Sequence, residues 1–189
     1  IKKLKKMKSI GIQPENIPKD ELFGLKRREI FEGKIFLKQF EVIVTNKCSL
    51  KCKKCAAGIQ YFQNPLNLEA KEIIKDYGRM LELIDWVDRV VVMGGEPFLY
   101  ENLGDVLEGI YQNTKTKEKV GAIKIITNGT IVPKDTTLKT MSKYGTIVWI
   151  SNYGKQSRNI SELIRCLRKN KIDYSVMPII GMVGCDSIK

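Results

Sequence analysis

The sequence predicts an α/β fold built around a parallel sheet, and three observations carry this prediction. From residue 39 onward, strand-like and helix-like segments alternate with a period of roughly 30 residues, the pattern of repeated βα units. The predicted strands have short cores that are apolar throughout, as expected when both faces of a parallel sheet are covered. Residue types that can bind ligands or metals follow the strand ends, where the loops of parallel α/β folds converge on one rim.

The individual elements are predicted from local patterns. In the first helix, apolar residues recur at helical spacing over 68–84. The apolar run from Val90 to Met93 stops at two glycines, and later runs stop at the polar turn residues Asn128 and Ser151. The predicted strands are 40–44, 87–93, 122–127, 146–150 and 172–177, and the predicted helices are 68–84, 103–111, 136–144 and 160–169.

The chain divides into three parts. Residues 1–38 form a basic N-terminal extension, 39–180 form the βα domain, and 181–189 form a C-terminal tail. Within the extension, Gly33 interrupts the segment 29–37, which indicates a hairpin or an extended arm. We expect this extension, a second chain or a further C-terminal segment to close the rim, because an open five-stranded sheet cannot exclude water by itself.

Size and cysteine usage limit the setting of the protein. The 189 residues are 43% hydrophobic, enough for one domain with a substantial core. No apolar run approaches the roughly 18 residues that a membrane span needs, so no membrane partner is expected. The crowded cysteines and the lack of a secretion signal favour a reducing, cytoplasmic location.

The charge balance indicates an anionic partner or substrate. The net charge is +12, from 33 Lys and Arg against 21 Asp and Glu. Apart from a dense group of lysines in residues 2–8, the excess is spread along the chain, without an arginine-rich stripe carrying interleaved aromatics. A nucleic-acid partner stays open but is not favoured, since a lysine-rich solvated surface explains the charge equally well.

The most informative motif is the run Cys48-Ser-Leu-Lys-Cys52-Lys-Lys-Cys55. Spacings of three and then two residues suit a short loop that wraps one side of an inorganic cube, rather than one helix face. Three thiolates would bind three irons of a [4Fe–4S] cluster and leave the fourth iron open to another ligand, whereas an electron carrier normally has four cysteine ligands.

A structural zinc site is the main alternative for these cysteines. Zinc normally takes four closed ligands from Cys and His, but the chain contains no histidine, and Cys166 and Cys185 lie far away as single residues. A disulfide is less favoured because no secretory signal is evident. The spacing favours the cluster, while zinc and incidental thiols stay open at this point.

A second motif, Gly94-Gly95-Glu96-Pro97, follows the second predicted strand. Two glycines let the backbone approach a ligand closely, and a carboxylate beside bare carbonyls suits a ligand that carries an ammonium group. Alone, the tetrapeptide is also what an ordinary strand–helix turn would contain, so its weight comes from its combination with the cysteines.

Together, the two motifs strongly resemble those of the radical SAM enzymes: Cys48-x-x-x-Cys52-x-x-Cys55 after one strand, then Met93-Gly94-Gly95-Glu96-Pro97 after the next. The resemblance extends over roughly residues 39–178. It implies a [4Fe–4S] cluster that binds S-adenosylmethionine at its open iron and cleaves it reductively. The resulting 5′-deoxyadenosyl radical would abstract hydrogen from a substrate that the sequence does not identify, with electrons from a donor such as flavodoxin or ferredoxin.

The resemblance also implies roles for individual residues, although it leaves the catalytic residues unknown. It makes the three cysteines the cluster ligands. Contacts to the methionine amino group would come from Gly94, Gly95 and Glu96, and contacts to the ribose or carboxylate from Asn128, Ser151 and Asn152.

Two departures from the family pattern matter. The residue before the third cysteine is Lys54, where the family usually has an aromatic residue that packs near the adenine. About five strands are predicted, whereas full family barrels have about six βα units. The expected fold is therefore an incomplete parallel (β/α) barrel of about five to six βα units, either a C-terminally truncated fragment or a reduced version with an open sheet.

The remaining notable residues have simpler expected roles. Cys166 lies on a predicted helix and should pack in the core, as should Trp86 and Trp149 beside the strands. Tyr153 would either face the substrate or pack at the rim. A function of another class also stays open: a basic nucleic-acid- or protein-binding module with a structural metal site, which would bind in a salt-sensitive way and leave S-adenosylmethionine intact.

Overall fold

The computed structural model describes residues 29–31, 33–66, 68–179 and 185–187. Most of the predicted extension, residues 1–28, lies outside the described residues. The main sheet has the order β1-β2-β4-β5-β6-β7. Only its first pair is antiparallel among these six strands, which are β1 (Glu29–Phe31), β2 (Lys34–Thr45), β4 (Trp86–Gly94), β5 (Val120–Thr127), β6 (Ile147–Asn152) and β7 (Tyr174–Pro178).

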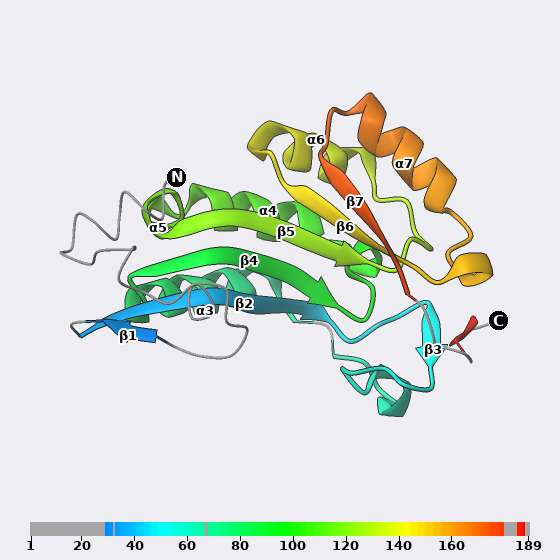
Figure 1. The fold of residues 1–189 in the computed structure, drawn as a ribbon, viewed down its shortest axis with the longest axis horizontal. Helices are drawn as coiled ribbons and strands as arrows, with labels where there is room; N and C mark the ends of the chain where they lie inside the picture. The colour runs from blue at the N-terminus through cyan, green and yellow to red at the C-terminus, as the bar shows by residue number, and fades with distance from the viewer. Residues whose placement is uncertain (1–28, 32, 67, 180–184, 188–189) are drawn as a thin grey trace.

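The five parallel strands of this sheet follow one another in space in the same order as in the chain (Figure 1). Each βα unit therefore adds its strand to the same growing edge, as in a barrel. Within the described residues the two edges, β1 and β7, are not paired with each other. The predicted parallel α/β fold and the incomplete barrel are both confirmed.

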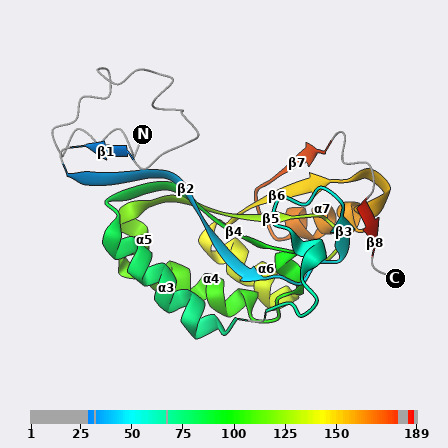
Figure 2. The same ribbon diagram turned by 90° about the horizontal axis from the view of Figure 1, so that it is seen from below.

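The helices lie on one face of this sheet, as Figure 2 shows. They are α3 (Ala70–Leu83), α4 (Leu103–Gln112), α5 (Thr114–Lys119), α6 (Asp135–Tyr144) and α7 (Ile160–Lys169). In the part of the chain that the structure describes, none of them is long and apolar enough to cross a membrane. The second face of the sheet carries half-buried charged side chains at Arg89 and Lys124.

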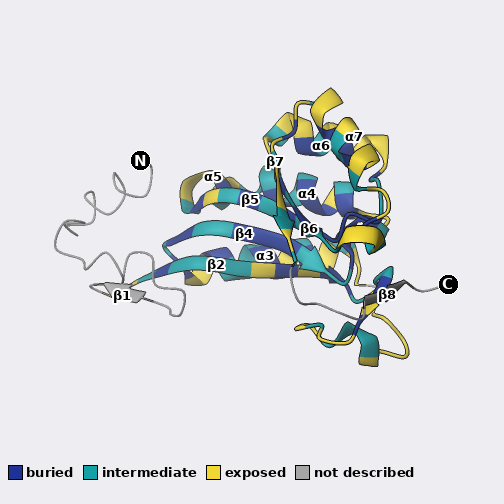
Figure 3. Cartoon of the chain, turned by 45° about the vertical axis from the view of Figure 1, so that its right-hand side comes forward, coloured by how far each residue is buried: buried dark blue, intermediate teal, exposed yellow. Residues whose placement is uncertain are grey.

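The hydrophobic core fills the space between the sheet and the helices. Val90, Ile125 and Ile150 of the strands pack into one cluster with Leu107 of α4 and Leu163 of α7, all fully buried. Figure 3 shows the matching pattern on α6 and α7, where the outer surfaces are exposed. Burial of this apolar surface is the main force that holds the helices to the sheet.

Two of the three residues expected in the core are found there. Trp86 is buried, and Cys166 packs against the core from a half-buried position. Trp149 is different: it is half-buried on the sheet face that lacks helices, with the Lys124 ammonium 3.8 Å from its ring centroid. Strand alternation explains the error, since Val148 and Ile150 on either side take the core-facing positions.

The predicted hairpin around Gly33 is confirmed. β1 and β2 pair across a turn in which Gly33 has a φ of 76°, a conformation that favours glycine. β2 starts at Lys34, so it begins earlier than the predicted strand 40–44. The Ile35 N–H donates to the Asp85 carboxylate (2.9 Å), and the Asp85 N–H donates to the Ile35 carbonyl (2.9 Å), which ties the hairpin to the start of β4.

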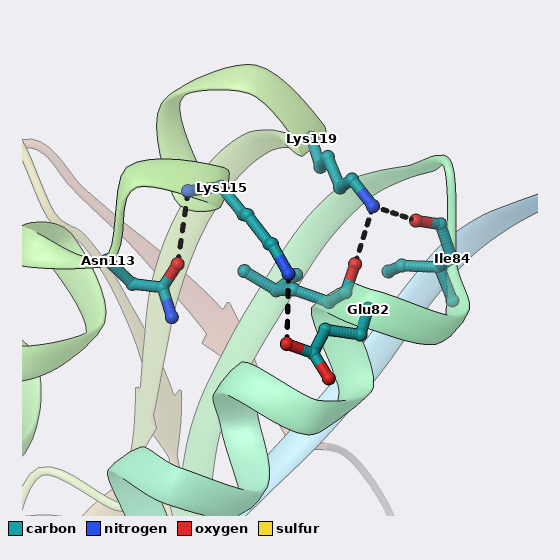
Figure 4. Close-up of polar contacts among 6 residues, drawn as sticks. Glu82, Ile84, Asn113, Lys115 and Lys119 are labelled. Carbon is teal, nitrogen blue, oxygen red and sulfur yellow. Dashed lines mark hydrogen bonds and ion pairs between the residues drawn. The ribbon is translucent and has the colours of Figure 1, made fainter.

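One short helix, α5, is absent from the sequence prediction. Its sequence, Thr-Lys-Thr-Lys-Glu-Lys, has no apolar periodicity to reveal it. The Asn113 side chain caps its start by accepting the Lys115 N–H (3.0 Å), and the Lys115 ammonium pairs with Glu82 of α3 (3.0 Å; Figure 4). Polar capping and contacts with α3 thus hold α5 in place.

Candidate functional site

The cysteine motif forms a loop at the C-terminal end of β2. Cys52 is buried and lies on β3 (Leu50–Cys52), while Cys48 and Cys55 are half-buried. The Cys55 N–H donates to the Cys52 carbonyl (3.2 Å), which turns the chain between these two cysteines. All three pack in one small cluster with Leu50 and Tyr153. The structure therefore brings the three predicted ligands together.

Three neighbouring thiols fit the ligand set of a multi-iron cluster, in which each thiolate binds a different iron. Among the described residues, no three Cys, His, Asp or Glu side chains converge on one metal position. Burial raises the pKa of the Cys48 thiol, against the Leu50 N–H that donates to its Sγ (3.4 Å). Metal binding at Cys48 would therefore release a proton.

The glycine pair fastens this loop to the end of β4. A Cβ atom on Gly94 would lie 2.2 Å from the Thr45 carbonyl oxygen, and one on Gly95 would lie 2.3 Å from the Lys47 carbonyl oxygen. The close approach allows the Gly95 N–H to donate to Thr45 (2.8 Å) and the Glu96 N–H to donate to Lys47 (2.8 Å). Both glycines are therefore required for contact with the cysteine loop, whatever ligand their carbonyls meet.

Glu96 is fully buried and connects two strand ends. Its Oε1 accepts the Phe98 N–H (3.1 Å) and the Thr127 hydroxyl (2.8 Å), and its Oε2 accepts the Asn128 N–H (2.8 Å). Desolvation raises the pKa of this carboxyl to about 7, although the three donors act in the opposite direction. The three hydrogen-bond partners of Glu96 all belong to the protein, and its predicted contact with an amino group stays a prediction.

Asn128 joins the end of β5 to the cysteine loop. Its Nδ2 lies 3.1 Å from Ser49 Oγ and 3.6 Å from Cys48 Sγ, while its Oδ1 accepts the Thr130 N–H (3.0 Å) and hydroxyl (2.6 Å). Its carbonyl also accepts the Ser157 hydroxyl (2.7 Å). Asn128 thus orients the residues around a predicted cluster ligand, and its predicted role toward ribose or carboxylate stays untested.

Ser151 and Asn152 end β6 on the same rim. Ser151 is buried, and the half-buried Asn152 accepts the Gly154 N–H through its side chain (2.9 Å). Ser157 folds back over this turn and accepts the Tyr153 N–H (2.9 Å). Tyr153 consequently packs against the cysteine cluster, the second of the two roles considered for it.

Sequence reasoning missed the hydroxyl groups that complete this rim. Ser49 and Thr130 hydrogen-bond to each other, Thr127 binds Glu96, and Ser157 links the ends of β5 and β6. Two of these residues stood in segments already singled out: Ser49 next to Cys48, and Thr127 next to Asn128. A lone Ser or Thr in a polar loop carries no spacing signal, so nothing in the sequence identifies Thr130 or Ser157.

An apolar cavity of about 660 Å³ opens beside Gly94, within the range of small-molecule sites. Its walls come from the ends of β2 and β4 and from the segment that follows Cys55. Lys54, in the position that is usually aromatic, is exposed. Apolar side chains line the cavity instead, among them Ile43, Phe62, Leu66 and Met93.

A second, two-stranded sheet pairs the backbone of Cys185 with the cysteine motif. β8 (Cys185–Ser187) is antiparallel to β3, and Cys185 is the partner of Cys52. This pairing brings the C-terminal tail back to the cysteine loop. Whether Cys185 is a spectator thiol or a ligand of an auxiliary site, the two roles that the sequence leaves open, is not tested by this backbone pairing.

Comparison with known protein families gives a match over most of the chain. Residues 42–175 match the Radical SAM superfamily. The chain is 29% identical over 98 residues to a probable GTP 3′,8-cyclase of Methanococcus maripaludis strain C6, and 30% identical over 98 residues to that of strain C5. Each match covers 52% of this chain and 30% of the relative, so the chain spans about a third of the length of these relatives.

Solved structures share the fold at low identity. Native anSMEcpe with bound AdoMet and Cp18Cys peptide has a TM-score of 0.57 and 18% identity, over 75% of this chain and 42% of that one. Streptococcus suis SuiB bound to S-adenosylmethionine has a TM-score of 0.52 and 20% identity, over 99% and 52%. With the family match covering most of the described sheet, the chain belongs to the radical SAM superfamily.

Proposed function

We propose that this chain is the part of a radical SAM enzyme that cleaves S-adenosylmethionine at a [4Fe–4S] cluster and starts hydrogen abstraction from a substrate. Enzymes of the superfamily use both cofactors. When bound, they supply one electron and a 5′-deoxyadenosyl radical. The observation that carries the proposal is the network in which Gly95, Glu96 and Asn128 fix the cysteine loop at the ends of β4 and β5.

In this proposal, the chain's own residues perform three tasks. Cys48, Cys52 and Cys55 act as thiolate ligands and give up their protons on metal binding. Gly94 and Gly95, here called the glycine clamp, hold the loop in one position relative to the sheet. The cavity beside Gly94 receives the S-adenosylmethionine, and its apolar wall, including Phe62, offers the adenine the surface that the exposed Lys54 does not.

The setting and partners follow from the same chemistry. Thiolate ligands at a metal site require a reducing compartment, so we propose a cytoplasmic location. The one-electron step needs an external donor of the flavodoxin or ferredoxin type. The similar proteins carry different substrates in their names, a nucleotide in one and a peptide in another, so likeness does not select the substrate.

Anaerobic reconstitution tests this proposal. The chain should take up about four irons and four sulfides, and dithionite with S-adenosylmethionine should give 5′-deoxyadenosine and methionine. Cys52→Ala should lose the cluster and the cleavage, because a three-thiolate site has no spare ligand. Cys166→Ala is the matched control, since Cys166 lies on α7 outside the motif, and it should keep both.

The opposite result is equally clear. One tightly bound zinc per chain with no cluster, or equal iron content in Cys52→Ala and Cys166→Ala, would overturn the proposal. A full cluster without cleavage would retain the metal site and reject the assigned activity of this chain.

A further inference from the structure

The sheet face without helices carries two cations around one aromatic ring. Arg89 of β4, Lys124 of β5 and Trp149 of β6 alternate with core residues of the same strands, so they project from the opposite face. The Lys124 Nζ lies 3.8 Å from the Trp149 ring centroid, and the Arg89 Cζ lies 5.5 Å from it. Both distances are within the range of cation–π contacts.

These two cations have no carboxylate partner among the described residues. The Arg89 Nε donates to the Gln39 Oε1 (2.7 Å), and the Gln39 Nε2 donates to Glu41 (2.9 Å). Glu41 therefore accepts from Gln39 and not from Arg89. Neither Arg89 nor Lys124 forms one of the ion pairs found in the described part of the chain. Burial, and then the Arg89 charge, lower the pKa of Lys124.

A purely structural role does not account for this arrangement. Two half-buried like charges repel each other and lose hydration, and an acid or an apolar side chain at either position would avoid that cost. An oxyanion between them would satisfy both. The Arg89 guanidinium is held through Nε, and no described residue forms a hydrogen bond with its two terminal nitrogens, which can form a fork for a phosphate or carboxylate.

The position of the pair relative to the rim limits the size of such a ligand. Arg89 lies five residues before Gly94, and Lys124 lies four residues before Asn128. At about 3.3 Å per residue, the pair is roughly 13–17 Å from the rim along the strands. A substrate bound there by one end would need to span that length for its other end to reach the cysteine loop.

We propose that Arg89 and Lys124, beside Trp149, bind the phosphate or carboxylate group of an elongated anionic substrate whose reacting end lies at the rim. This inference rests on the proposed function. It makes Arg89 and Lys124 specificity-determining residues on the open face of the sheet.

Anaerobic titration calorimetry on the cluster-loaded chain tests the inference, with pyrophosphate and succinate as separate probes. At least one probe should bind, and Lys124→Met, which keeps the alkyl stem over Trp149, should weaken it by about tenfold or more. Arg89→Gln should do the same, and Lys124→Arg should restore most of the affinity. Lys139→Gln and Arg79→Gln, which remove exposed charges from helices, should bind like the parent.

The two probes distinguish a phosphate from a carboxylate substrate, and either result supports the inference. Equal binding in Lys124→Met and Lys139→Gln would overturn it, as would no binding of either probe at millimolar concentration. A single-stranded oligonucleotide that binds through Arg89 while both small anions fail would overturn it in favour of a nucleic-acid surface. Loss of S-adenosylmethionine cleavage in the parent, with probe binding intact, would reject the proposed function and leave the anion site.

Discussion

At the N-terminal end of the parallel strands, the half-buried Lys119 completes the hydrogen bonding at the end of a helix. The Lys119 ammonium donates to the carbonyls of Leu81 and Ile84 (2.7 Å each), where α3 turns into β4 (Figure 4). At the C-terminal end, Glu96 and Asn128 are buried and connect segments from three different βα units. The contacts at the N-terminal end complete the hydrogen bonding of a helix, whereas those at the C-terminal end position the cysteine loop.

The difference teaches where a change should affect function and where it should affect stability alone. Contacts at the N-terminal end link elements that are already joined by the core, so their loss should be a modest, local cost. The contacts of the rim have no apolar core behind them, because the cysteine loop packs mainly on itself and Tyr153. Loss of a rim contact should therefore displace the thiols as well as lower stability.

The largest effect is expected for Gly95→Ala. The added methyl group would collide with the Lys47 carbonyl at 2.3 Å and with the Cys48 Cβ at 2.9 Å, so the loop or the strand must move. We expect a loss of about 3 kcal/mol or more in the free energy of unfolding. Iron content after anaerobic reconstitution should fall with it, as measured beside urea unfolding.

Gly104→Ala is the control for this substitution. A Cβ on Gly104 of α4 would lie 3.6 Å from its nearest neighbour, an ordinary contact. Alanine should stabilise that helix by about 0.5–1 kcal/mol and leave iron content unchanged. Equal stability of the Gly95 and Gly104 variants would show that the clamp does not hold the loop.

The second-largest effect is expected for Glu96→Gln, which should change how the free energy of unfolding depends on pH. The pKa of the folded carboxyl is about 7, above its ordinary value of 4.5, so the folded state keeps a proton that the unfolded state releases. Stability from this group is full below pH 4.5 and falls as pH rises to about 7, by about 2–3 kcal/mol. Gln cannot ionise, so the stability of the variant relative to the parent should rise over this interval.

Thermal unfolding at several pH values measures this difference, with the exposed Glu101→Gln as the charge-matched control. The control should follow the parent across the whole range. A constant difference between the parent and Glu96→Gln from pH 4.5 to 8 would contradict the prediction.

Asn128→Ala should cost about 2 kcal/mol, because it leaves Ser49 and Thr130 without their shared partner in a buried site. The cysteine loop should also lose its link to β5, so iron content should fall. Asn152→Ala removes a rim asparagine with a single local side-chain contact to Gly154 and should cost less. Identical iron content in both variants would show that Asn128 does not hold the cysteine loop in place.

The sequence predicted the parallel sheet and the grouping of the cysteines well, because both depend on local patterns. Apolar runs ending in glycine or asparagine mark the strand ends, and parallel topology brings those ends together. Side-chain roles were harder to predict. The glycines at 94 and 95 read as a ligand-facing turn, whereas their Cα atoms face Thr45 and Lys47, a contact between distant segments that spacing does not encode.

Trp149 shows the same limit on the opposite face. An aromatic residue within an apolar run is expected in the core, but the strand period assigned the core positions to its neighbours. Its partner Lys124 comes from another strand, and the pairing depends on the register between β5 and β6. Register follows from packing of the whole sheet, so a single sequence reveals it only after the fold is known.

The smallest effect, and the sharpest test of the comparison, is expected for Lys119→Met at the N-terminal end. Methionine keeps a long apolar stem but removes the ammonium that bridges two carbonyls at the end of α3. Because the net contribution of a hydrogen bond to stability is modest, the loss should be about 1 kcal/mol. Lys117→Met, on an exposed position of the same helix, should change stability by less.

Iron content and S-adenosylmethionine cleavage should match the parent in both variants, since no contact of Lys119 reaches the rim. A cluster lost from Lys119→Met at unchanged stability would mean that the two ends of the sheet are coupled, and that the separation between a structural end and a chemical end is wrong.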